Sequence, residues 1–162
     1  MAVKNIILLA TMLSAGAFAA HAEPKVAVKD MPPEVIAAVQ KAQPGITITE
    51  AEYKARDGRE YYDVEGKLKG AEIELDMLKQ NGVWEVVEIQ RDIKWSSAPA
   101  AVREAVEKSS KGIVPVRVIE SKQADDKGVV YELFAPGQPQ DPAVEVMWKN
   151  NKAEVLKERW PH

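Results

Sequence analysis

Acidic side chains at every second position are the residues of this chain whose spacing could support chemistry. They are Asp63, Glu65, Glu72, Glu74 and Asp76. The positions between them are mostly apolar, so in β-strands the carboxylates would share one face of a sheet. Carboxylates gathered in this way can act as acid and base in glycoside cleavage, bind calcium, or attract a basic partner.

Two of these chemistries are disfavoured by the pattern itself. Carboxylates on an open sheet face have no pocket to raise a pKa, which general acid catalysis requires. The aspartates beside glycine or another aspartate, at Asp57 and at Asp125–Asp126, lack the alternate oxygen ligands and closing glutamate of an EF-hand loop. They are typical of turns. A binding face for a basic partner and a simple solvated face remain open.

The chain is poor in the usual catalytic side chains. It has no cysteine, which excludes thiolate nucleophiles, cysteine-ligated zinc and iron–sulfur clusters. Its two histidines are His21, inside the N-terminal segment, and His162, the last residue. A Ser-His-Asp triad or a histidine metal site therefore has no histidine in a central position. We predict a protein that is not an enzyme and needs no cofactor or metal.

The N-terminal segment has the organisation of a secretory signal. Lys4 gives a short basic start, an apolar run follows, and Ala20-His21-Ala22 resembles a cleavage site. We expect residues 1–22 to be a signal peptide and the protein to be periplasmic or secreted. No later stretch is long and apolar enough to span a bilayer, so no membrane insertion is expected after cleavage. The formal net charge of −3 and the absence of a basic patch argue against nucleic acid as a partner.

Two parts of the chain follow the same order of signals. Pro32, Val35 and Val39 start a helical pattern, and Pro99, Val102 and Val106 start another. Each is followed by four stretches with strand alternation, separated by turn signals such as Asn-Gly. The expected strands are 46–53, 60–65, 71–78, 83–93, 114–120, 129–134, 143–148 and 153–160.

This order predicts an α+β fold made of a tandem repeat of helix plus four antiparallel strands. The expected repeats are residues 30–93 and 97–160, with the helices packed on one face of a curved antiparallel sheet. In the strand 83–93, strict alternation puts Val87 and Ile89 on one side and Trp84 and Val86 on the other.

Several motifs resemble those of a known family. They are the hairpin E-A-E-Y-K-A-R-D-G-R-E-Y-Y-D-V-E (50–65), the stretch G-V-W-E-V-V-E (82–88), and residues 88–93 running into the proline-led helix at Pro99. The chain from about 30 to 160 resembles the PepSY-like proteins, and more closely the tandem, beta-lactamase-inhibitor-like, PepSY-like periplasmic proteins. The resemblance implies a sheet that binds enzymes through its concave face, regulation or inhibition of a peptidase, and no catalytic residues.

Strand alternation then predicts which side chains form the binding face. If Tyr62, Val64 and Leu75 face the helices, their neighbours face outward. The predicted partner-binding residues are Tyr61, Asp63, Glu65, Glu74, Glu132, Phe134, Glu145 and Met147. Acidic groups with aromatic anchors suit a basic protein or peptide. The alternative is an envelope sensor that binds a cation or a small cationic ligand. The four tryptophans, Trp160 among them, are expected to serve core packing.

Overall fold

Two-residue turns of a single kind build most of the sheet. Both central residues have positive φ at Asp57–Gly58, Lys69–Gly70, Asn81–Gly82 and Asn150–Asn151. This conformation matches the right-handed twist of antiparallel strands, and Gly, Asn and Asp adopt it most readily. Each such turn folds a strand back onto the one before it, so strands that follow each other in sequence also pair in space.

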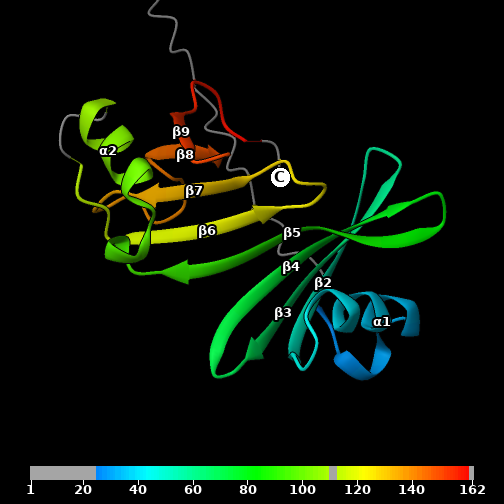
Figure 1. Ribbon diagram of the computed structural model, residues 1–162. Coiled ribbons are helices and arrows are strands. Elements are labelled where there is room, and N and C mark those ends of the chain that lie inside the picture. The colour runs from blue at the N-terminus through cyan, green and yellow to red at the C-terminus, as the bar shows by residue number, and fades with distance from the viewer. Residues whose placement is uncertain (1–24, 110–112, 161–162) are drawn as a thin grey trace, which may run out of the picture.

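The computed structural model describes residues 25–109 and 113–160. In these residues nine strands form one antiparallel sheet whose order follows the chain from β1 to β9 (Figure 1). The strands are β1 (Lys25–Val26), β2 (Thr47–Arg56), β3 (Arg59–Leu68), β4 (Ala71–Gln80), β5 (Val83–Ile93), β6 (Arg117–Gln123), β7 (Val129–Phe134), β8 (Val144–Lys149) and β9 (Lys152–Val155). The helices are α1 (Pro33–Ala42) and α2 (Ala100–Ser109), with 3-10 turns at Val28–Asp30 and Trp95–Ser97.

The predicted fold class, an α+β tandem repeat of helix plus four antiparallel strands, is wrong. The described chain is a single nine-stranded sheet, with β1 as an extra strand before α1 and two α-helices in all. The description as two repeated sheets of four strands fails because β5 is not an edge strand. It pairs with β6 from Glu88↔Gln123 to Ile93↔Val118, so the backbone hydrogen bonding continues through the middle of the chain. The predicted signal peptide, residues 1–22, lies outside the described residues.

Each helix covers its own hydrophobic cluster. In α1, Val35 and Val39 are fully buried against a cluster that includes Val64 and Leu75. In α2, Val102 and Val106 pack with four buried side chains of β6, β7 and β8. Those four are Val118, Tyr131, Leu133 and Val146. Within the described part of the chain, no helix is both long and apolar enough to cross a membrane.

A β-bulge in β5 changes which side chains face the helices. Met77 lies opposite Val86, but its neighbour Asp76 lies opposite Glu88, so one residue of β5 is extra. Ile89 therefore joins Val86 and the buried Trp84 against the first cluster, contrary to strict alternation. The same step turns Glu88 to the opposite face.

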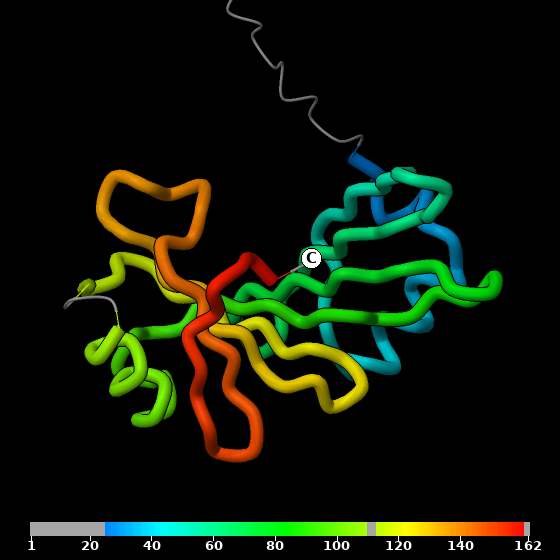
Figure 2. The backbone as a smooth tube through the Cα atoms, turned by 90° about the horizontal axis from the view of Figure 1, so that it is seen from above, coloured from blue at the N-terminus to red at the C-terminus, as the bar shows by residue number. Residues whose placement is uncertain are grey.

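The last strand is shorter than the sequence pattern predicts. The expected strand 153–160 ends at Val155, and Leu156 makes one more backbone bond, from its N–H to Glu145 O at 2.9 Å. The segment Leu156–Trp160 then leaves the edge of β9. In Figure 2 this red segment crosses toward the middle of the molecule.

Because the two clusters share one hydrogen-bonded sheet, we predict a single cooperative unfolding transition. Leu75→Ala in the first cluster and Leu133→Ala in the second remove fully buried side chains. Each should lower the free energy of unfolding by about 2–5 kcal/mol. Urea titrations followed by far-UV circular dichroism and tryptophan fluorescence should give coincident curves for both variants.

Val83→Ala is the control, since Val83 is 59% exposed and should change the stability little. Two separate transitions, with Leu75→Ala moving only one of them, would contradict a shared cooperative unit.

Candidate functional site

The face of the sheet turned away from the two helices, called the open face below, carries a row of carboxylates. Cross-strand pairing sets Asp63 directly opposite Asp76, and Asp76 opposite Glu88. One row further along, Glu65 lies opposite Glu74. Like charges placed directly opposite each other on neighbouring strands repel. The sequence thus concentrates five carboxylates on three adjacent strands.

This crowding changes the proton affinity of two groups. Burial, reinforced by the charges of Asp63 and Glu65, raises the pKa of Glu74 to about 7. Burial raises the pKa of Asp76 to about 8, with further contributions from the charges of Glu88 and Glu74 and from a hydrogen bond to Glu88. A cation placed among these groups would favour their charged forms. The row can therefore exchange protons for positive charge near neutral pH.

Polar side chains from the second half of the sheet fix the inner end of the row. Glu88 is 3% exposed, and its Oε1 accepts a hydrogen bond from Gln123 Nε2 at 2.8 Å. Ser121 Oγ also donates to Glu88 Oε1, and Gln123 Nε2 lies 2.7 Å from Ser121 Oγ. On the other side, Gln90 Nε2 donates to Asp76 Oδ2 at 3.1 Å. These bonds satisfy a buried carboxylate that would otherwise be costly.

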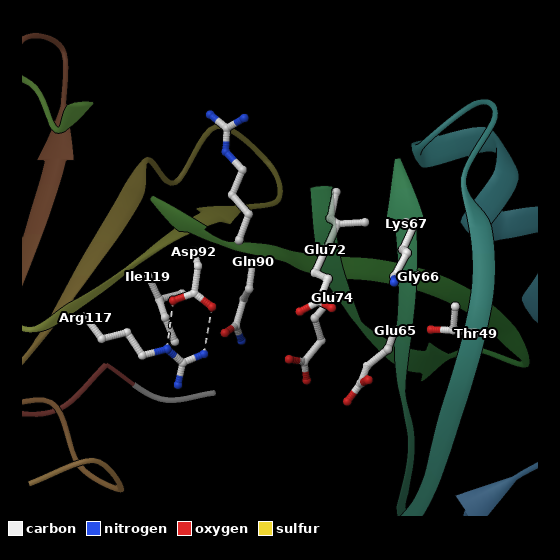
Figure 3. A pocket seen from close by; sticks show the side chains of 12 residues that line it. Thr49, Glu65, Gly66, Lys67, Glu72, Glu74, Gln90, Asp92, Arg117 and Ile119 are labelled. Carbon is white, nitrogen blue, oxygen red and sulfur yellow. Dashed lines mark hydrogen bonds and ion pairs between the residues drawn. The ribbon is translucent and has the colours of Figure 1, made fainter. Parts of the chain in front are cut away.

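A hollow of about 210 Å³ lies beside the row, between β2 and β6. Figure 3 shows Arg117 and Asp92 at one end of it, Gln90 and Glu74 in the middle, and Glu65 toward the other end. Arg117 donates two hydrogen bonds to Asp92, at 2.7 and 2.9 Å. The hollow is smaller than the roughly 300–1,000 Å³ of small-molecule pockets. Four carboxylates line it, together with three cationic side chains at Lys67, Arg91 and Arg117. Its size suits a single side chain, and the carboxylates at Glu65 and Glu74 favour a cationic one.

The eight predicted binding residues fall into two groups. Asp63, Glu65 and Glu74 belong to the acidic row, and Asp63 pairs with Lys54. Tyr61 lies at the end of the same strands, with the Arg56 guanidinium 5.7 Å from its ring centre.

The second group lies on β7 and β8, and most of it is covered. Glu132 and Glu145 lie directly opposite each other and are 7% and 5% exposed. Phe134 is 4% exposed, beneath the Arg117 guanidinium at 5.4 Å. Met147 is half-buried opposite Val130. Phe134 is therefore not an exposed aromatic anchor, and the outer surface here is formed by other residues.

Sequence reasoning missed those other residues. Arg159 Nη1 lies 3.1 Å from Glu145 Oε1, and the Trp160 N–H donates to Glu145 Oε2 at 2.6 Å. The Trp160 indole N–H donates to Gln123 Oε1 at 2.9 Å. The only signal in the sequence was the pair Arg159-Trp160, a basic residue followed by an aromatic one. It was overlooked because both residues were assigned to the expected strand 153–160. Glu88 was missed because the bulge reverses its side.

Metal binding by the acidic residues has no geometric basis in the ranges 25–109 and 113–160. No group of three or more Asp, Glu, His or Cys side chains there is arranged to hold a metal ion. Asp57, Asp125 and Asp126 have positive φ and lie in turns, as their sequence context predicts.

Known proteins resemble this chain in fold only. No protein-family model matches the sequence, and no curated protein is significantly similar to it. One similar solved structure is a DUF2874 family protein from Bacteroides uniformis ATCC 8492, with 20% identity and a TM-score of 0.52 over 78% of this chain and 87% of that one. Another, from Bacteroides eggerthii DSM 20697, is described as one of the "putative periplasmic proteins", with 18% identity and a TM-score of 0.50 over 77% and 87% of the two chains. At these identities the likeness shows a shared fold.

The raised pKa of Asp76 predicts a stability that falls as pH rises. The carboxyl binds its proton more tightly in the folded chain, so its folded pKa of about 8 exceeds the unfolded value near 3.8. Its contribution is fully present below about pH 4 and is lost as pH rises to about 8. Asp76→Asn, which keeps a neutral donor beside Glu88, should match the wild type near pH 4 and exceed its stability at pH 9 by a few kcal/mol.

The measurement is urea unfolding at both pH values. Asp57→Asn, in an exposed turn, is the matched control and should follow the wild type at both. An Asp76→Asn difference that is the same at pH 4 and pH 9 would disprove the pKa shift as its cause.

Proposed function

We propose that this chain is a secreted or periplasmic, non-catalytic binding module that engages a basic protein or peptide segment through its open face. The observation that carries the proposal is the cross-strand row from Asp63 through Asp76 to Glu88, with Glu65 and Glu74 beside it. In the free protein these carboxylates repel each other and two hold protons near neutral pH. A Lys or Arg side chain from a partner would relieve that repulsion, which makes the free energy of binding more favourable.

The partner class follows from the size of the site and from its surroundings. A hollow of about 210 Å³ accepts a side chain rather than a whole cofactor. The resemblance to PepSY-like and beta-lactamase-inhibitor-like proteins makes a peptidase or another envelope enzyme the kind of protein to be regulated or inhibited. The signal-like N-terminus supports export, and so does the neighbour from Bacteroides eggerthii.

The test is calorimetry with an acetylated, amidated decapeptide of alternating lysine and alanine. Binding should be measurable at low salt and should weaken at 150 mM salt. Since ionised carboxylates bind the peptide best, its affinity should rise from pH 6 to pH 8.5. Glu65→Gln/Glu74→Gln should reduce the affinity at least about ten-fold, as expected for losing two favourable charge pairs.

Glu104→Gln/Glu107→Gln on α2 is the matched control, because it removes the same charge from exposed positions on another element. It should leave the affinity within about two-fold. If both double variants lost the same amount of peptide affinity, the effect would come from net charge alone. That result would contradict a binding site at Glu65 and Glu74. Calcium binding without peptide binding would favour a cation binder over this proposal.

A further inference from the structure

The C-terminal segment Leu156–Trp160 lies on the open face as a short peptide would lie on a receptor. It reaches the face through Arg159 and Trp160, whose three polar contacts to Glu145 and Gln123 measure 2.6–3.1 Å. The donors are a guanidinium, a backbone N–H and an indole N–H. The acceptors all belong to strands β6 and β8.

The two acceptors are largely buried side chains of the sheet. Glu145 is the second residue of β8, is 5% exposed, and offers one carboxylate oxygen to each of two donors, both of which belong to the segment. Gln123 is 8% exposed, and its Nε2 is held by Glu88 and Ser121, which leaves Oε1 facing the indole of Trp160. The Gln123 side chain is thus preorganised, which lowers the entropy cost of binding any ligand that supplies an indole N–H.

The segment is held at its first residue, by the backbone N–H of Leu156, and again at Arg159 and Trp160, with exposed residues between them. Lys157 and Glu158 are exposed, and the Arg159 side chain keeps 54% of its surface in contact with solvent. A short segment with few buried contacts opens at low cost. The strands below it belong to the continuous sheet and do not need to move when it leaves.

We propose that Leu156–Trp160 is a built-in occupant of a peptide site, and that a partner protein displaces it with an extended segment carrying a cationic residue followed by tryptophan. The partner's cation would take the place of Arg159 at Glu145, and its indole N–H would take the place of Trp160 at Gln123. The inference rests on the proposed function. It narrows the partner from any basic segment to a segment with both a basic and an aromatic side chain.

The attachment of the segment sets how strongly a partner must bind. A ligand tethered by a short linker has an effective concentration of roughly millimolar. A free peptide with the same contacts must compete with that concentration, so its apparent affinity for the wild-type chain is reduced. Emptying the site should restore the intrinsic affinity.

The experiment uses the full chain and a pentapeptide with the sequence of residues 156–160, acetylated and amidated. Arg159→Ala/Trp160→Ala should bind this peptide at least about ten-fold more tightly than the wild type, measured by calorimetry. Lys157→Ala/Glu158→Ala, in the same segment, should behave as the wild type. Adding Glu145→Gln to the opened variant should abolish the gain.

Two peptide-binding results would overturn the inference, and so would a change of oligomeric state. One is an opened variant that keeps the wild-type circular dichroism and melting temperature but does not bind the peptide. The other is a wild type that binds it equally well. A concentration-dependent dimer of the opened variant or the wild type by analytical ultracentrifugation, through exchanged segments, would replace a foreign partner by a second copy and would also overturn it.

A second readout covers the case in which the opened variant does not fold. Glu145→Gln alone should release Arg159, so trypsin should cleave after Arg159 several-fold faster than in the wild type. An unchanged cleavage rate would show that Glu145 does not hold the segment and would overturn the inference. The segment does not line the hollow at Glu65 and Glu74, so this test and the lysine-peptide test fail independently.

Discussion

The pairing of β5 with β6 is the constraint on which both the fold and the site depend. It joins strands β1–β5 to strands β6–β9 by backbone hydrogen bonds, and each of these two groups of strands buries its own hydrophobic cluster under a helix. The same register brings Glu88 beside Gln123 and places Gln90 opposite Ser121. Without this pairing Glu88 would be a carboxylate at a strand edge, exposed to water. With it, Glu88 is buried and the acidic row of one half is joined to the polar side chains of the other.

The acidic row is a cost that the rest of the fold has to offset. Directly opposed carboxylates destabilise a sheet, and burial adds to the penalty. Three features reduce this cost. Lys54 forms an ion pair with Asp63, and the Gln90 amide donates a hydrogen bond to Asp76. Glu74 and Asp76 also retain protons near neutral pH. A row placed here for solubility alone would be better left exposed and unopposed. Of the row, Glu65 and Glu74 line the hollow, and carboxylates in that position suit a positive charge that arrives from outside.

Much of the sheet could be predicted because its signals are local. Asn81–Gly82 specifies its hairpin turn, and alternation in β3 and β4 predicts which side chains face the cluster. The errors came from non-local features. The sequence of β5 does not indicate that β6 will pair with it. The predicted repeat therefore ended after β5, where the sheet in fact continues. The bulge that reverses Glu88 depends on pairing with β4, and the end of β9 at Val155 depends on contacts that Glu145 makes across the sheet.

The hollow and the C-terminal segment are linked by a chain of polar contacts, and this link limits how a partner could use both. Trp160 bonds to Gln123, Gln123 to Glu88, and Glu88 is coupled to Asp76 and through it to the acidic row. A cation in the hollow favours the charged form of Glu74, which lines it, while Glu88 accepts the Gln123 amide N–H. That orientation keeps Gln123 Oε1 available to an indole. The hollow and the Gln123 acceptor therefore lie at two ends of one polar network, and a partner that supplies both a cation and an indole would contact both ends.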